Sequence, residues 1–162
     1  MANLFEPEFD ESIDRPGYRW QRAFLGRQVG AERLGASLLA LAPDSAAFPM
    51  HYHLGNEEML IVIAGRPSLR TPDDERELEV GEVVSFPRGT EGAHQVVNRS
   101  EEEARILLIS EMNAPEVVVR PESKQLSAME RPPGSRGEGI HKIFMLEDEV
   151  EFWDAHEPPP ER

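Results

Sequence analysis

The chain has 162 residues, which is enough for one domain with its own hydrophobic core. Its 31 acidic and 17 basic residues give a net charge of −14. That charge repels phosphate backbones and anionic lipids, so it argues against nucleic-acid and membrane partners. There is no cysteine, which excludes disulfides, thiolate metal ligands and thiol nucleophiles.

The N-terminus has no basic region followed by an apolar stretch, so it does not read as a signal peptide. The longest apolar run, residues 59–64, is too short to span a bilayer. These features predict a soluble cytoplasmic protein. We expect residues 1–18, which are acidic and contain proline, to form an N-terminal arm that lies on the domain or is loosely ordered.

Short apolar runs broken by Gly, Pro and Asp favour an all-β fold, either a sandwich or a small barrel. Turns are expected where such residues gather, at 65–66, 72–74 and 87–89. There is no internal repeat, so only one barrel fits in this length. We expect strands at 18–28, 34–42, 47–52, 58–64, 67–70, 77–79, 83–86, 95–97, 105–110 and 116–119.

The strand expected at 58–64 is apolar on both faces. Glu58, Leu60 and Val62 point to one side, and residues 59, 61 and 63 point to the other. The first side would face the interior. The second would be covered by the flank of another sheet, by the N-terminal segment or by a dimer partner.

The C-terminal region, residues 127–162, is expected to be an extension outside the main domain. Residues 127–139 are typical of a linker or long loop, and residues 140–146 of one more strand. We expect Phe152 and Trp153 to dock on the domain or on a second subunit, and residues 157–162 to be disordered. His141 and His156 are interpreted as surface histidines.

Two clusters of ionisable residues carry the chemistry of this chain. In the first, His51 and His53 lie two residues apart on an extended segment, so both imidazoles project to one side and can reach one ion. Glu57 or Glu58 follows a Gly-Asn turn and can swing back as a third ligand. In the second, His94 follows a turn rich in Gly and Pro, and it supplies one more imidazole.

These clusters resemble the motifs of a known family. The stretch HYHLGNEEMLIVIAG is similar to the first cupin motif, and GEVVSFPRGTEGAHQVVN is similar to the second. The resemblance implies a cupin double-stranded β-helix, also described as a jelly-roll barrel, over residues 19–126. It also implies His51, His53, Glu58 and His94 as metal ligands. Glu58 is preferred to Glu57 because six residues separate it from Gly65, the spacing of the motif.

Such a ligand set, three imidazoles and one carboxylate without sulfur, suits one divalent transition metal per chain. Fe, Mn, Zn, Ni, Co and Cu are all compatible, whereas Ca and Mg are disfavoured. Among the neighbouring residues, Tyr52 and Gln95 point away from the ligands by alternation. Asn98 is expected to hydrogen-bond backbone groups, and Arg88 and Glu91 are expected to be exposed loop charges.

A fold and a metal site do not define an activity. The leading hypothesis is a metal-dependent enzyme that acts on a small polar or carboxylate-bearing molecule, because a purely structural barrel does not need a full ligand set. The alternative is a non-catalytic protein that binds a small ligand, or a barrel stabilised by its metal. The motifs offer no convincing general base beyond the ligands, and no catalytic residue is assigned. A homodimer is expected, since cupins commonly pair.

Overall fold

The computed structural model describes residues 2–135 and 137–153. Nearly all of its regular structure is β, and no helix in these ranges is long and apolar enough to cross a membrane. The elements in chain order are β1 (Glu11–Arg15), β2 (Tyr18–Ala23), α1 (Leu25–Gln28), β3 (Leu34–Leu41), β4 (Ser45–Ala46), β5 (Tyr52–His53), β6 (Glu58–Ala64), β7 (Ser68–Arg70), β8 (Glu75–Glu77), β9 (Val83–Phe86), η1 (Thr90–Gly92), β10 (Gln95–Asn98), β11 (Ala104–Glu111), β12 (Glu116–Arg120), β13 (Gln125–Met129), β14 (His141–Met145) and η2 (Leu146–Asp148).

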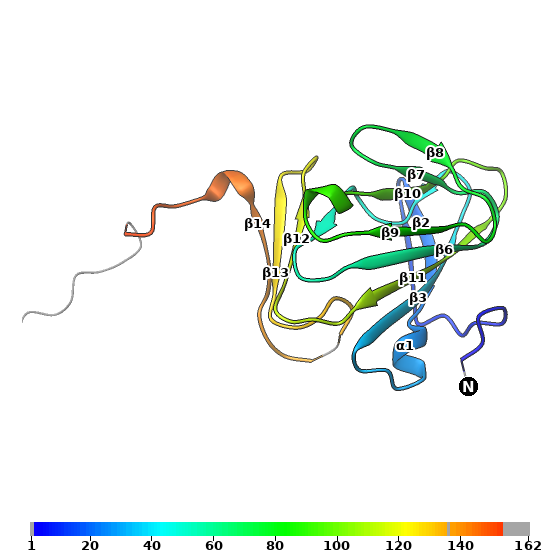
Figure 1. The fold of residues 1–162 in the computed structure, drawn as a ribbon, viewed down its shortest axis with the longest axis horizontal. Coiled ribbons are helices and arrows are strands. Elements are labelled where there is room, and N and C mark those ends of the chain that lie inside the picture. The colour runs from blue at the N-terminus through cyan, green and yellow to red at the C-terminus, as the bar shows by residue number, and fades with distance from the viewer. Residues whose placement is uncertain (1, 136, 154–162) are drawn as a thin grey trace, which may run out of the picture.

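The strands form three antiparallel sheets that together make the expected all-β barrel (Figure 1). The largest sheet has the order β1-β2-β3-β11-β6-β9, and a four-stranded sheet β4-β10-β7-β8 lies across the interior from it. A third sheet, β14-β13-β12-β5, stands at one end of the barrel. Strands distant in sequence therefore meet, and β11 lies between β3 and β6.

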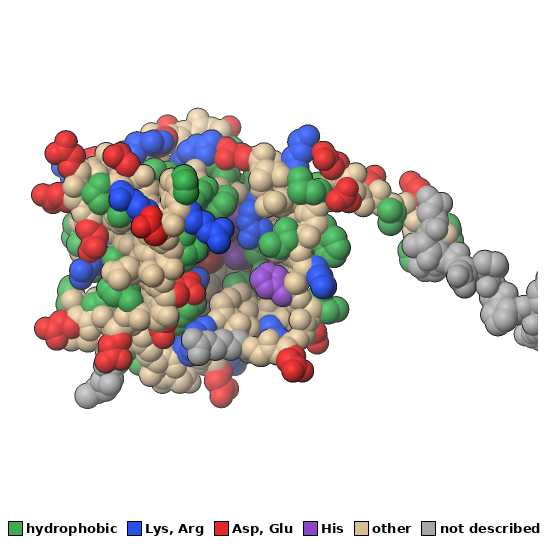
Figure 2. Space-filling view, turned by 180° about the vertical axis from the view of Figure 1, so that it is seen from behind, with side chains coloured by type: hydrophobic (Ala, Val, Ile, Leu, Met, Phe, Trp, Pro, Cys, Tyr) green, Lys and Arg blue, Asp and Glu red, His purple; other side chains and the backbone are tan. Residues whose placement is uncertain are grey.

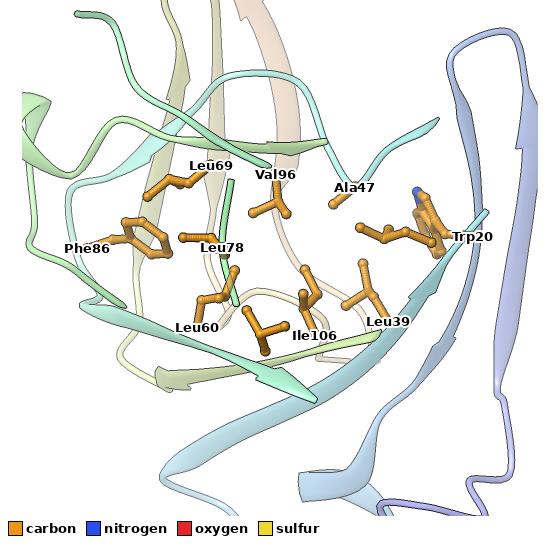
Figure 3. Packing of buried hydrophobic residues seen from close by; sticks show 11 residues of the cluster. Trp20, Leu39, Ala47, Leu60, Leu69, Leu78, Phe86, Val96 and Ile106 are labelled. Atoms are coloured by element: carbon orange, nitrogen blue, oxygen red, sulfur yellow. The ribbon is translucent and has the colours of Figure 1, made fainter. Parts of the chain in front are cut away.

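The hydrophobic core fills the space between the two larger sheets (Figure 3). Leu39, Leu60 and Ile106 project from the six-stranded sheet toward Leu69 and Val96 of the four-stranded sheet. All five side chains are at most 5% exposed. On β6 and β11 the burial follows the alternation of the strand, whereas on β3 the residues of both faces are buried.

The inward positions change from apolar to polar along the barrel axis. Four neighbouring strands of the six-stranded sheet show the same change toward the same end, because antiparallel pairing brings their polar ends together. The interior of the barrel is therefore polar at this end and apolar beneath it. The residues, apolar first, are Trp20 and Arg22 on β2, Leu39 and Ser37 on β3, Ile106 and Ser110 on β11, and Leu60 and Glu58 on β6.

Three of the expected strands are wrong in part. The run expected at 18–28 ends at Ala23, where a helical turn, α1, connects β2 to its antiparallel neighbour β3. The strand expected at 47–52 is replaced by the short strands β4 and β5, and this segment contains Pro49, which has no N–H to donate. The strand expected at 77–79 lies two residues earlier, because the turn closed by Thr71 N and Asp74 O leads straight into β8.

The chain ends contribute more strands than the sequence suggests. Within the N-terminal arm, β1 pairs with β2 at the edge of the large sheet. At the other end, β13 begins just before the expected linker and runs into it as far as Met129, and it pairs with β14, which matches the strand expected at 140–146. After β14 the chain runs away from the barrel (Figure 1), and Phe152 and Trp153 stay 65% and 77% exposed. His156 and residues 157–162 lie outside the described ranges.

Candidate metal centre

Backbone pairing brings His51 and His94 together across the mouth of the barrel. The N–H of His51 donates to the carbonyl of His94 at 3.1 Å, and the N–H of His94 donates to the carbonyl of His51 at 3.0 Å. This isolated antiparallel bridge places the two imidazole centroids 4.7 Å apart. Residues from the two separate sequence clusters thus share one site.

His53 and Glu58 complete the group. His53 ends β5 and Glu58 begins β6, after the turn that contains Gly55. One carboxylate oxygen of Glu58, Oε2, lies 3.3 Å from Nε2 of His53 and 3.7 Å from Nε2 of His94. Donor atoms of His51, His53 and Glu58 all lie within 4.8 Å of one another, an arrangement that can hold one metal ion.

The histidine tautomers suit metal binding. Nδ1 of His51 lies 2.8 Å from the carbonyl oxygen of Pro49, and Nδ1 of His94 lies 2.9 Å from that of Gly92. Because a carbonyl oxygen can only accept, both Nδ1 atoms must carry a proton, which leaves the lone pair on Nε2. The 3.3 Å separation between Glu58 and His53 also fits, since adjacent ligands about 2.1 Å from an ion lie about 3.0–3.4 Å apart, and the 3.7 Å separation between Glu58 and His94 is somewhat longer.

A fully buried carboxylate, Glu116, lies behind His53. Its Oε2 is 3.5 Å from Nδ1 of His53, which has no closer hydrogen-bond partner among the described residues. The same carboxylate accepts the N–H of Gly55 at 3.0 Å, the N–H of Val117 at 2.8 Å and the amide of Asn56. Glu116 therefore ties the orientation of His53 to the turn that leads to Glu58.

Packing fixes the orientation of His94. Its ring stacks on Phe86, with centroids 3.6 Å apart and an angle of 6° between the planes. The preceding turn is tight, because a Cβ on Gly92 would lie only 1.9 Å from the carbonyl oxygen of Pro87. The stretch between Gly89 and His94 forms the 3₁₀ turn η1.

The three imidazoles have different electrostatic surroundings. Burial, reinforced by the neighbouring imidazoles, lowers the pKa of His51 well below its ordinary value, and burial likewise lowers that of His94. Burial also acts to lower the pKa of His53, but the Glu116 and Glu58 carboxylates outweigh it and raise that pKa. His51 and His94 are therefore held neutral, the form that binds metal.

The metal-free protein should lose stability on mild acidification. Below pH 6.5 the unfolded chain protonates the His51 and His94 imidazoles, whereas the native state, in which both pKa values are lowered, resists protonation. Stability should then fall by about 1.4 kcal/mol per pH unit for each proton taken up on unfolding. The raised pKa of His53 has the opposite effect at higher pH. The stability that it contributes is fully present below pH 6.5 and is lost as the pH rises through the native pKa of His53.

Denaturant unfolding of chelator-treated protein between pH 7 and pH 5 measures this slope. A His51→Gln/His94→Gln variant should show a shallower slope over the same range. An equal slope in the two proteins would contradict the assignment of the effect to these imidazoles.

Residues beside the ligands have structural roles. Gln95 donates to the carbonyl of Phe48 and accepts from Arg70, both at 2.9 Å. Asn98 is fully buried and hydrogen-bonds backbone groups, as predicted. Arg88 is an exposed loop charge that pairs with Glu111, and Glu91 is also exposed.

A cavity of about 220 Å³ opens above the candidate ligands, and Figure 2 shows a hollow on this face with basic and histidine side chains around it. His51, His53 and Glu58 line it, together with Arg22 of β2 and Arg120 of β12. The apolar part of its wall consists of Phe48, Pro49, Leu108, Val118, Met129 and Pro133.

Three residues of this site were missed in the sequence: Arg22, Glu116 and Arg120. Each lies in or directly beside an expected strand and alternates with a buried apolar residue, Trp20 for Arg22 and Val118 for the other two. A charge on an inward face was the signal that could have found them.

The barrel has the cupin fold. Residues 37–110 match the family model of the cupin domain, and this segment contains all four candidate ligands. No curated protein matches the chain in sequence.

Solved structures share the fold. A sugar phosphate isomerase from a cupin superfamily, from Silicibacter pomeroyi, superposes with a TM-score of 0.76 at 20% identity over 95% of this chain and 98% of that chain. A predicted oxalate decarboxylase from Thermotoga maritima gives a TM-score of 0.57 at 17% identity over 68% and 97% of the two chains. The polyketide cyclase RemF from Streptomyces resistomycificus gives 0.51 at 25% identity over 61% and 70%.

Proposed function

We propose that the protein is a metal-dependent enzyme that acts on a small polar or carboxylate-bearing molecule. The observation that carries the proposal is the convergence of His51, His53 and Glu58 at the floor of an open cavity, with His94 directly beside His51 and Glu58. A structural site would be closed by protein ligands, whereas four ligands beneath a cavity leave room for a further one.

The residues of the site have separate roles in this proposal. The four ligands would hold one divalent transition metal, and Glu116 would keep His53 oriented for it. The apolar wall of the cavity would exclude water from the bound molecule. A bound divalent ion supplies Lewis acidity, which polarises an oxygen ligand or acidifies a coordinated water.

Elemental analysis of protein purified without added metal tests the site. We expect about one transition-metal ion per chain in the wild type and loss of that ion in a His51→Ala/His94→Ala variant. His141→Ala is the matched control, because His141 lines the cavity wall without being a proposed ligand. Metal-free wild-type protein that takes up no ion on reconstitution would overturn the site.

Binding without turnover is the second candidate function. Among the described residues that line the cavity, His141 is the only imidazole or carboxyl group besides the proposed ligands. A general base is therefore scarce, which favours a binding role. Turnover that disappears on chelation would support the enzyme, and tight binding of a ligand that is recovered unchanged would support the binding protein.

The proposal includes a homodimer formed through the C-terminal extension. Ile143 and Phe144 on the edge strand β14 are 57% and 52% exposed, and Phe152 and Trp153 follow them on the segment that leaves the barrel. Met59, on the outer face of β6, is also 39% exposed. Such clustered apolar surface is typical of protein–protein contacts.

Light scattering after size-exclusion chromatography tests the dimer. The wild type should elute with twice the mass of one chain, and a Phe144→Ser/Trp153→Ser variant should elute as a monomer. Val29→Ser, which changes an exposed apolar residue on the barrel side, should leave the dimer intact. A wild type that is monomeric at every concentration would contradict the proposed dimer.

We further propose a cytoplasmic location and no nucleic-acid or membrane partner, in keeping with the charge of −14.

A further inference from the structure

Two arginines project into the cavity above the candidate metal centre, from two different sheets. Arg22 comes from β2 in the six-stranded sheet, and Arg120 ends β12 in the sheet at the barrel end. Both line the same 220 Å³ cavity as His51, His53 and Glu58. Basic side chains accordingly gather around the hollow of Figure 2.

These arginines lack the acidic partners that other arginines have. Arg66, Arg70 and Arg88 each pair with a glutamate on the surface. Within the described part of the chain, Arg120 makes no ion pair, and Arg22 has only a 3.9 Å contact with Glu11. In a chain with 31 acidic residues against 17 basic ones, Glu58 is the only carboxylate among the described residues that line this cavity, and it makes no ion pair with either arginine.

Neutral hydroxyls orient the two groups instead. Arg22 donates to Ser37 at 3.0 Å, and Arg120 donates to Ser127 at 2.7 Å. The Nε of Arg22 is buried without a hydrogen-bond partner among the described residues. Burial lowers the pKa of both guanidinium groups, and for Arg22 it outweighs the opposing effect of the Glu11 and Glu58 carboxylates.

Aromatic packing holds Arg22 in place. Its guanidinium carbon lies 4.2 Å from the ring centre of Phe24 and 5.6 Å from that of Phe48. Such stacking uses the face of the guanidinium and leaves its N–H edges for hydrogen bonds in the plane. Carboxylate and phosphate groups match that edge geometry.

We propose that the cavity binds a small organic anion whose carboxylate or phosphate group is held by Arg22 and Arg120 while its remaining oxygen atoms face His51, His53 and Glu58. This inference rests on the proposed function and narrows its substrate to an oxyanion. The volume supports a molecule of a few carbon atoms, since 220 Å³ corresponds to about seven water molecules at about 30 Å³ each.

Calorimetric titration with defined probes tests the inference. Malonate carries carboxylates and glycerol 3-phosphate carries a phosphate, and malonamide and glycerol are their uncharged counterparts. We expect at least one of the two anions to bind the protein as purified and neither uncharged compound to do so. The anion that binds identifies which oxyanion the arginines accept.

Variants assign the binding to the two arginines. Arg22→Gln and Arg120→Gln should each weaken anion binding at least about tenfold, the usual effect of losing a charge-assisted hydrogen bond. Arg22→Lys and Arg120→Lys keep the charge and the fold but lose the fork, and they should weaken binding less. Arg19→Gln is the matched control, because Arg19 is exposed on the same strand as Arg22.

Repeating the titrations after chelation separates this inference from the proposed function. Anion binding that depends on the arginines supports the inference, even if elemental analysis finds no metal and the proposed function fails. Anion binding that needs metal but is unchanged in all four arginine variants overturns the inference and leaves the proposed function standing. Binding of the uncharged probes as tightly as the anions, or no binding of either anion, also overturns it.

Discussion

A Glu116→Gln variant is expected to bind metal about 10- to 100-fold more weakly than the wild type, the usual effect of losing a carboxylate that orients a ligating histidine. The change is isosteric, so it removes charge and acceptors while preserving volume. An amide nitrogen would face the N–H of Gly55, the N–H of Val117 or the amide of Asn56, all of which now donate to the carboxylate. The cost to folding should be about 2–3 kcal/mol, because the site is fully buried.

The protonation of His53 gives a readout that a general loss of stability would not produce. Because Glu116 acts to raise the pKa of His53, the variant should show a lower His53 pKa by NMR titration of metal-free protein. Glu111→Gln is the control, since Glu111 is an exposed carboxylate that also accepts a backbone N–H. An unchanged His53 pKa in folded Glu116→Gln protein would show that the two groups are not coupled.

Replacing Asn98 by Asp should cost about 3–5 kcal/mol of folding stability, a large share of the total for a domain of this size. The amide nitrogen of Asn98 donates to the carbonyls of Leu41, Ala42 and Glu102 at 3.1, 3.2 and 2.7 Å. A carboxylate at this fully buried position would place an acceptor, and a charge, against carbonyl oxygens.

Urea unfolding near neutral pH measures the loss. Asn3→Asp is the matched control: Asn3 uses only its side-chain oxygen as an acceptor, from Phe5 and Glu6 at an exposed site, so the same change should alter stability by less than about 0.5 kcal/mol. If Asn98→Asp unfolded at the same urea concentration as the wild type, its amide hydrogen bonds would contribute nothing to stability.

The sequence predicted the all-β barrel because its strands have strong local signals. Glu58–Ala64 and Val83–Phe86 have the same bounds in the structure as in the prediction, since apolar alternation and flanking turn residues define both. The strand expected at 47–52 failed because that segment is held by distant partners, such as Val96 for Ala47 and His94 for His51. Backbone hydrogen bonds to such distant residues leave no pattern in the local sequence.

The candidate site was predictable to a similar degree. Two histidines two residues apart and a nearby glutamate are a local pattern, and the structure brings His51, His53 and Glu58 together with His94. Glu116 and Arg120 belong to β12, which meets β5 through the pairing of Val118 with His53 and of the next residue with Tyr52. Their place at the site depends on a sheet contact across more than sixty residues of sequence, which spacing alone does not reveal.

The segment that matches the cupin model contains only part of the cavity lining. All four candidate ligands lie within residues 37–110, whereas Arg22 precedes that segment and Arg120, Ser127 and His141 follow it. The residues that would hold the ion and those that would select the bound molecule are thereby separated along the chain. Exchange of the flanking strands between relatives could redirect the barrel to a different molecule without altering a single ligand.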